Sequence, residues 1–246
     1  MGLDILFIHP NASKKIYQGL SNEHSAIEPP IWAGMLANHC RNKNFNVKIL
    51  DCEVKGIDYL IAAKEISSIK PRIACFVVYG QQPSASSQNM VGAVATSEEL
   101  KKIDPEIKTL FVGGHMSALP RETLLNEESI DLIALNEGVY AISNLLKVEN
   151  LNDENLLKKV KGIGFKNKDN KIILNESEII VPKKLLDTDL PGVAWDLLPP
   201  LSKYRTAGWH SWTNSSEKQP FAALYTSLGC PYTCSFCMIN IINRVD

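Results

Sequence analysis

Five short apolar runs, each followed by a segment of helical periodicity, constrain the fold of this 246-residue chain more than any other feature. Four of the runs are nearly continuous in apolar residues instead of alternating, as in parallel strands that are covered on both faces. The runs are residues 3–9, 46–51, 72–79, 108–113 and 130–135. The helical segments are residues 29–40, 57–69, 88–103, 119–127 and 138–147. A strand followed by a helix, five times over, predicts a doubly wound α/β sheet.

The connections that follow the predicted strands point to one edge of this sheet as the place for a ligand. Ligands of such sheets bind beyond the carboxyl ends of the strands. There the sequence has a long loop at 10–28, a small polar segment at 79–88 and paired glycines within 112–120, which permit close backbone approach. The fifth run leads to Glu137 and Gly138 at the same edge. Ordinary surface loops would give a similar pattern, so loop composition alone leaves both interpretations open.

The character of the sequence changes after about residue 150. Residues 163–177 are expected to form a β-hairpin with its turn at 168–171, and 181–204, rich in Pro and Asp, an extended connector. An apolar strand is expected at 221–230, directly before a group of cysteines. We therefore divide the chain into three parts, which are residues 1–148, 149–219 and 220–246.

The six cysteines fall into two groups. Three are isolated in apolar stretches and are expected to be buried, namely Cys40, Cys52 and Cys75. The other three have the spacing C-x3-C-x2-C and are Cys230, Cys234 and Cys237. Three thiolates on one loop can hold three irons of a cubane cluster and leave the fourth iron without a protein ligand. A structural zinc site is the competing interpretation, but it needs a fourth ligand, and only His210 lies nearby, upstream.

The cysteine motif, with aromatic Phe236 directly before its last cysteine, resembles the signature of the radical S-adenosylmethionine enzymes. Leu228 stands where relatives often have Arg. The segments PPIWAGMLANHCR, GGHMSALPRETL and NEG look like the amino-terminal cobalamin domain of the cobalamin-dependent branch of that superfamily. The hairpin and the segment DTDLPGVAWDLLP resemble the linker before its barrel.

This resemblance implies a Rossmann-like, flavodoxin-like cobalamin domain with five parallel strands. After the hairpin and linker would come the first strand and cluster loop of an incomplete (β/α) barrel. The implied cofactors are a [4Fe–4S] cluster on the three motif cysteines, S-adenosylmethionine and cobalamin. The implied cofactor-binding residues are Pro10, Tyr79, Gly80, Gln81, Ser84, Ser86, Gly113, Gly114, His115, Met116, Glu137, Gly138 and Phe236.

The D-x-H-x-x-G motif, whose histidine ligates cobalt in other cobalamin domains, is absent after the first strand. That place reads HPNASKK, so the resemblance implies cobalamin bound without a ligand from His9. His115 is expected either to contact the corrin or to be a plain turn histidine. No catalytic residue is assigned, because radical abstraction needs no general base.

By resemblance, the activity is methyl transfer to an unactivated centre through a 5′-deoxyadenosyl radical and methylcobalamin. A small-molecule substrate and an external electron donor of flavodoxin or ferredoxin type are expected partners. The chain ends about one element into the barrel, so we expect it alone to be catalytically incomplete. Two alternatives stay open, which are a corrinoid carrier or sensor and a radical enzyme whose α/β domain is a cobalamin-free scaffold.

Charge and hydropathy limit the partners and the cellular location that can be expected of the chain. The net charge is −1 and Lys and Arg are spread along the chain, which argues against a nucleic-acid partner. No apolar run approaches the roughly 18 residues of a membrane span, and the N-terminus lacks the basic region of a signal peptide. The expected location is the cytoplasm.

Overall fold

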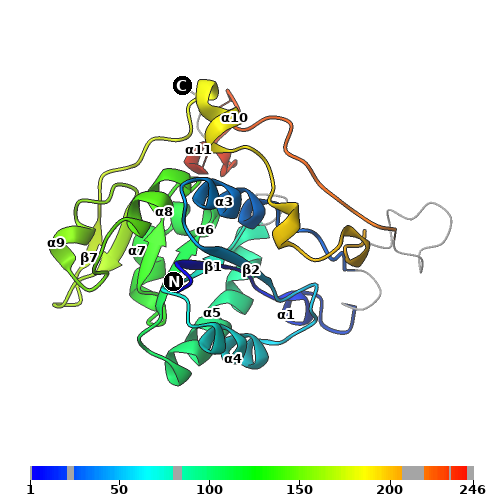
Figure 1. The fold of residues 1–246 in the computed structure, drawn as a ribbon, viewed down its shortest axis with the longest axis horizontal. Helices are drawn as coiled ribbons and strands as arrows, with labels where there is room; N and C mark the ends of the chain where they lie inside the picture. Colours follow the sequence, from blue (N-terminus) through cyan, green and yellow to red (C-terminus); the bar gives the residue numbers. More distant parts are fainter. Residues whose placement is uncertain (1, 21–24, 80–84, 207–218, 233, 243–246) are drawn as a thin grey trace.

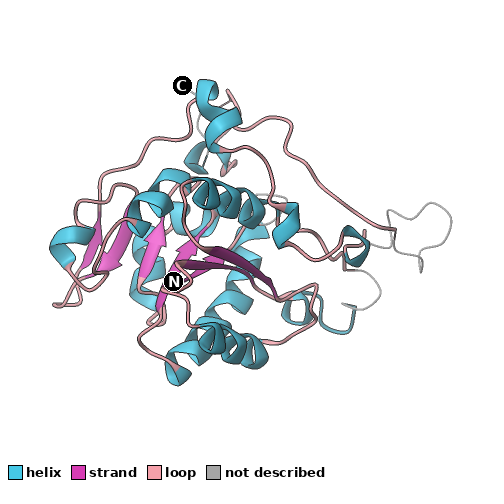
Figure 2. Cartoon of the chain, viewed as in Figure 1, coloured by secondary structure: helices cyan, strands magenta, loops and turns pink. Residues whose placement is uncertain are grey.

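A single mixed sheet with helices on both faces organises the chain (Figures 1 and 2). The computed structural model describes residues 2–20, 25–79, 85–206, 219–232 and 234–242. The strand order is β2-β1-β3-β4-β5-β6-β7. The first five strands are parallel and comprise β1 (Ile5–His9), β2 (Val47–Asp51), β3 (Ile73–Val77), β4 (Lys108–Val112) and β5 (Leu132–Ala134). This order confirms the predicted flavodoxin-like arrangement, in which the strand order reverses direction between β1 and β3.

Alternate residues of each strand enter separate cores on the two faces. In β1, Ile5 and Phe7 join one core and Leu6 and Ile8 join the other. The first core is covered by α3 (Ile31–Asn42) and α8 (Val139–Leu146). The second is covered by α4 (Tyr59–Ile69), α5 (Ala85–Ile103), α6 (Gly114–Ala118) and α7 (Pro120–Asn126). Burial on both faces explains why the strands read as continuous apolar runs.

The predicted hairpin forms, but it extends the sheet instead of standing apart from it. Strands β6 (Ile163–Lys166) and β7 (Ile172–Leu174) are antiparallel, and β6 pairs with β5. The sheet therefore has seven strands, and the prediction of five was wrong. Without β6, the backbone groups along the outer edge of β5 would lack partners, which is costly for a strand buried on both faces.

The predicted strand at 221–230 does not form. In and beside it, the structure has isolated bridges instead of a ladder, among them Ile27 with Arg205, Arg205 with Pro220 and a bridge at Cys230. A strand exists through its ladder of hydrogen bonds to a neighbour, and the described residues of this segment form no such ladder, although the amide of Phe221 donates to the carbonyl of Tyr204 at 3.2 Å. The first barrel strand thus stays a prediction for a chain in which further strands are present.

The connector lies across α3 and is pinned to it. The amide of Ala194 donates to the carbonyl of Gly34 at 3.1 Å, and Asn38 Nδ2 donates to the carbonyl of Gly192 at 3.0 Å. His39 Nδ1 lies 2.7 Å from the carbonyl oxygen of Asp189. Helix α3 is consequently covered by the sheet on one side and by the connector on the other, and all of residues 31–37 are buried.

The other helices among the described residues are short. They are α1 (Ser13–Tyr17), η1 (Gln18–Leu20), α9 (Glu154–Leu157), η2 (Lys183–Leu185), α10 (Leu186–Asp189), η3 (Trp195–Leu197), η4 (Leu201–Lys203) and α11 (Ile239–Ile242). No helix in the described ranges has the length and apolar character needed to cross a bilayer.

Gly34 provides a test of this packing. Alanine normally stabilises a helix relative to glycine by about 1 kcal/mol. A Cβ at Gly34 would overlap Cγ1 of Val193, however. We expect Gly34→Ala to lower the free energy of unfolding by about 1–3 kcal/mol, measured by urea denaturation, because the connector must shift. The double variant Gly34→Ala/Val193→Ala should recover part of this loss, whereas a stabilising single substitution would contradict the docked connector.

Candidate functional site

The turn after β4 lies at the carboxyl edge of the sheet and is tightly packed against the end of β3. Gly113 has φ +156°, and a Cβ there would overlap the carbonyl oxygen of Val78. The hydroxyl of Ser86 donates to that same carbonyl and accepts from the amide of His115 at 3.1 Å. Glycine is therefore required at position 113 by the close approach of two backbone segments.

The side chains of His115 and Met116 point to different surroundings. His115 is half-buried, its Nδ1 lies 2.9 Å from Ser87 Oγ, and burial lowers its pKa, so the imidazole is neutral at pH 7. Met116 is fully buried in the core beneath the edge. Of this pair, His115 is the residue with a side chain near the surface of the edge.

The end of β5 is held by the connector. Glu137 is 4% exposed, and its Oε1 accepts from the amide of Val181. Burial raises the pKa of Glu137 to about 7, and the hydrogen bond from Val181 offsets part of that rise. Gly138 has φ +76°, and a Cβ there would lie 2.6 Å from Val112 Cγ2. Glu137 and Gly138 therefore pack against the connector and the end of β4, respectively.

Tyr79 lies at the same edge, after β3. Its hydroxyl donates to the carbonyl of Asn136 at 2.6 Å, and its ring lies 5.0 Å from the ring of Trp32. Pro10 is buried directly after β1. Gly80, Gln81 and Ser84 lie outside the described residues. As contacts to cobalamin, all of these residues stay predictions.

The cysteine loop presents its three thiols to differing degrees. Cys230 and Cys237 are half-buried, Cys234 is exposed, and the amide of Cys237 donates to the carbonyl of Cys234 at 3.1 Å. Phe236 is 91% exposed. Across the part of the chain that the structure describes, no three His, Cys, Asp or Glu side chains are gathered as metal ligands. The fit to an iron–sulfur cluster therefore rests on the donor set, three thiols within one short loop, and the ligand role stays a prediction.

The segment directly after this loop touches the glycine turn. A Cβ at Gly114 would lie 3.0 Å from Met238 Cε and 3.1 Å from Ile242 Cδ1. Helix α11 packs against α6, as Figure 1 shows. The end of the cysteine loop and the glycine turn are thus in direct contact, although about 120 residues separate them.

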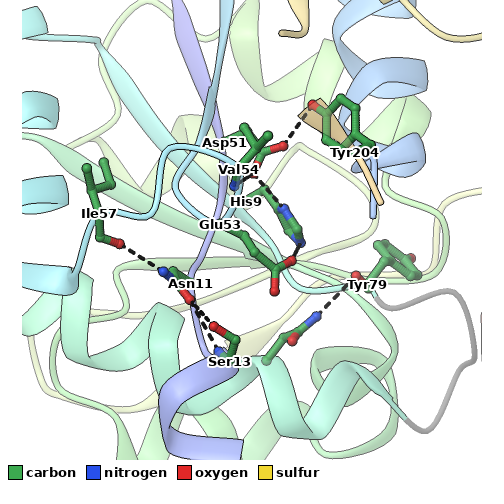
Figure 3. Close-up of polar contacts among 10 residues, drawn as sticks. His9, Asn11, Ser13, Asp51, Glu53, Val54, Ile57, Tyr79 and Tyr204 are labelled. Atoms are coloured by element: carbon green, nitrogen blue, oxygen red, sulfur yellow. Dashed lines mark hydrogen bonds and ion pairs between the residues drawn. The ribbon is translucent and has the colours of Figure 1, made fainter. Parts of the chain in front are cut away.

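A buried ion pair beside the edge was not anticipated from the sequence. His9 and Asp51 end β1 and β2 and are paired in register, and His9 Nδ1 lies 3.1 Å from Asp51 Oδ1 (Figure 3). The hydroxyl of Tyr204, which is 0% exposed, donates to Asp51 Oδ2 at 2.9 Å. The sequence signals only that His and Asp end apolar runs, and nothing in it marks Tyr204 as their partner.

The charges around His9 decide its protonation. Burial lowers the pKa of His9. The charge and hydrogen bond of Asp51, together with the charges of Glu53 and Glu28, outweigh this effect and raise the pKa to about 9. His9 Nε2 lies 4.0 Å from Glu53 Oε2, and burial raises the pKa of Glu53 to about 7. His9 is therefore cationic at neutral pH, whereas a metal-ligating imidazole must be neutral. That His9 does not ligate cobalt stays a prediction.

Comparison with known proteins identifies the sheet domain. A family model for the B12 binding domain matches residues 20–146, just over half of the chain. The chain belongs to the B12-binding domain family. An uncharacterized methyltransferase of Pyrococcus horikoshii is 27% identical over 215 residues, which are 87% of this chain and 41% of the relative. An anaerobic magnesium-protoporphyrin IX monomethyl ester cyclase of Rubrivivax gelatinosus is 26% identical over 239 residues, 95% of this chain and 38% of the relative.

The fold is shared beyond the B12-binding domain. The cobalamin-dependent S-adenosylmethionine radical enzyme OxsB, solved with aqua-cobalamin and S-adenosylmethionine bound, matches 96% of this chain with a TM-score of 0.64 at 18% identity. This chain covers 28% of that structure and less than half of each curated relative named above. The structural likeness therefore concerns the arrangement of sheet, hairpin and connector.

The hydrogen bond of Tyr204 to Asp51 is expected to stabilise the fold. Tyr204→Phe keeps the ring but removes a hydrogen bond to a buried carboxylate. The free energy of unfolding, measured by urea denaturation at pH 7, should fall by about 1.5–3 kcal/mol. Tyr17→Phe, at an exposed tyrosine, should change it by less than about 0.5 kcal/mol. Equal effects of the two substitutions would contradict the role of Tyr204.

Stability should fall as pH rises. The pKa of His9 is raised from 6.5 to about 9, so its contribution is complete below pH 6.5 and is lost as pH rises through 9. The pKa of Glu53 is raised from 4.5 to about 7, so folding loses stability between these values as well. We expect the free energy of unfolding to drop by roughly 1–3 kcal/mol from about pH 6.5 to about pH 9. His9→Gln should flatten this profile, and an unchanged slope in that variant would contradict the assignment.

Proposed function

We propose that this chain is the amino-terminal part of a cobalamin-dependent radical S-adenosylmethionine enzyme that transfers a methyl group to an unactivated centre. Residues 1–148 would hold cobalamin, 149–219 would connect, and 220–246 would begin the barrel. The relatives are described as a methyltransferase and a cyclase, and both descriptions are compatible with radical chemistry beside a corrin.

One observation carries the proposal. The carboxyl edge of a B12-binding sheet lies against the segment that carries three cysteines at C-x3-C-x2-C spacing, through the contact of Met238 and Ile242 with Gly114. A sheet of this class binds its ligand at that edge. The likeness to OxsB over 96% of this chain supports the same arrangement of sheet and connector.

The residues of this chain would have distinct tasks. Cys230, Cys234 and Cys237 would supply the thiolates of a [4Fe–4S] cluster, with Phe236 beside it. Gly113 permits the close approach of two loops, and the neutral imidazole of His115 can exchange a hydrogen bond with an amide side chain of the corrin. When bound, the cluster, S-adenosylmethionine and cobalamin would supply the radical and the methyl group. A small-molecule substrate and an external electron donor complete the proposal.

A second candidate has a specific observation in its favour. Several residues at the edge make their contacts within the chain. Ser86 is hydrogen-bonded to Val78, Glu137 is hydrogen-bonded to Val181, and Gly114 is covered by Met238. Such an edge also suits a scaffold that binds no corrinoid. The two candidates differ in one measurable property, which is uptake of cobalamin by the purified chain.

Anaerobic reconstitution tests the proposal. The chain is incubated with iron, sulfide and hydroxocobalamin, desalted, and assayed by absorption spectroscopy and metal analysis. We expect about one corrin and about four irons per chain. Iron without corrin would favour the scaffold, corrin without iron would leave a carrier or sensor, and the absence of both would contradict the proposal.

Cysteine variants supply the matched control. Cys234→Ala removes one of three expected ligands and should abolish iron binding while corrin uptake is retained. Cys52→Ala removes a buried thiol outside the motif and should leave both contents unchanged. Equal loss of iron in the two variants would indicate unspecific binding.

A further inference from the structure

Gly114 is covered by the chain segment that leaves the cysteine loop. A Cβ at this position would lie 3.0 Å from Met238 Cε, 3.2 Å from Met238 Sδ and 3.1 Å from Ile242 Cδ1. These separations are tighter than ordinary carbon contacts, so a larger residue would require the ends of the Met238 and Ile242 side chains to give way. Ile242 is 3% exposed, which shows that α11 is seated on the turn.

The turn beneath α11 is itself held by hydrogen bonds. The amide of His115 donates to Ser86 Oγ at 3.1 Å, and the Ser86 hydroxyl donates to the carbonyl of Val78 at the end of β3. Ser87 Oγ lies 2.9 Å from His115 Nδ1. Contacts therefore run without interruption from β3 through the turn to Met238.

Met238 directly follows Cys237, the last thiol of the motif. The amide of Cys237 donates to the carbonyl of Cys234, which closes the loop in front of Met238. Because Met238 is the next residue in the chain, a displacement of its backbone is transmitted directly to Cys237. The thiol is one residue away from a side chain that rests on the carboxyl edge.

From this geometry we propose that Gly114, Met238 and Ile242 form a positioning contact that fixes the cysteine loop over the carboxyl edge. The contact sets the separation between the cluster thiolates and the corrin. Gly114 is thus a positioning residue, and its small size serves α11 and not a direct contact with the corrin. The part of this inference that concerns the cofactors rests on the proposed function.

The contact is tested first in the chain without cofactors. Alkylation of Cys237 by iodoacetamide is followed by mass spectrometry, with exposed Cys234 as the internal reference. Gly114→Ala and Met238→Ala should each raise the relative rate at Cys237 by about five-fold, because the seated state of α11 loses population. Since both act on one contact, the double variant should be little faster than the faster single variant.

The matched control is Gly19→Ala, which adds a Cβ in open space and should leave the rate unchanged. Unchanged rates in both test variants, an equal increase in Gly19→Ala or additive effects in the double variant would overturn the contact. These results do not depend on cofactor binding, so they distinguish failure of the contact from failure of the proposed function.

The reconstituted chain tests the positioning role. The reduced cluster and cob(II)alamin are both paramagnetic, and electron paramagnetic resonance reports their mutual coupling, which depends on their separation. Gly114→Ala should retain both cofactors and show at least a two-fold weaker coupling. Unchanged coupling would overturn the positioning role, as would faster alkylation of Cys237 in the wild-type chain on addition of cobalamin, because the corrin would then displace α11.

Discussion

The described residues that follow the hairpin take their position from the way in which the connector, residues 181–204, is fixed to the sheet. Buried polar contacts hold it at both ends, since Val181 donates to Glu137 and Tyr204 donates to Asp51. Between them, Ala194 and Gly192 bond α3. Buried donors and acceptors are costly to leave unmade, so each contact opposes release of the connector. The segment that carries the cysteines therefore starts from a defined place beside the carboxyl edge.

Of two histidines at this edge, one is cationic and the other is neutral, and their surroundings explain the difference. His9 is surrounded by carboxylates, chiefly Asp51, and is cationic at neutral pH. His115 has a hydroxyl as its partner, and burial keeps it neutral. The charge of His9 serves the ion pair that also receives Tyr204. A neutral imidazole suits hydrogen bonding to an uncharged ligand group, which fits the role proposed for His115.

Most of the sheet could be predicted from the sequence, because strands that are buried on both faces consist of nearly continuous apolar residues. The five parallel strands lie where the apolar runs are, whereas the flavodoxin-like strand order was implied only by the family resemblance. Pairing was harder to foresee, because the apolar side chains of Ile163 and Phe165 fit a free hairpin as well as the edge of β5. The strand expected at 221–230 needs neighbours, and its own residues cannot reveal whether they are present. Contacts such as Tyr204 with Asp51 join residues 153 positions apart and leave no local pattern.

The central claim is that the carboxyl edge binds cobalamin without a nitrogen ligand from His9. Electron paramagnetic resonance of cob(II)alamin bound to the chain tests it directly, because an axial nitrogen splits each cobalt line into three. We predict that cob(II)alamin is retained after desalting and that its spectrum lacks splitting from a protein nitrogen, in the wild-type chain and in His9→Gln alike. Loss of the corrin on desalting would contradict binding at this edge, and a nitrogen splitting that disappears in His9→Gln would contradict the account of His9.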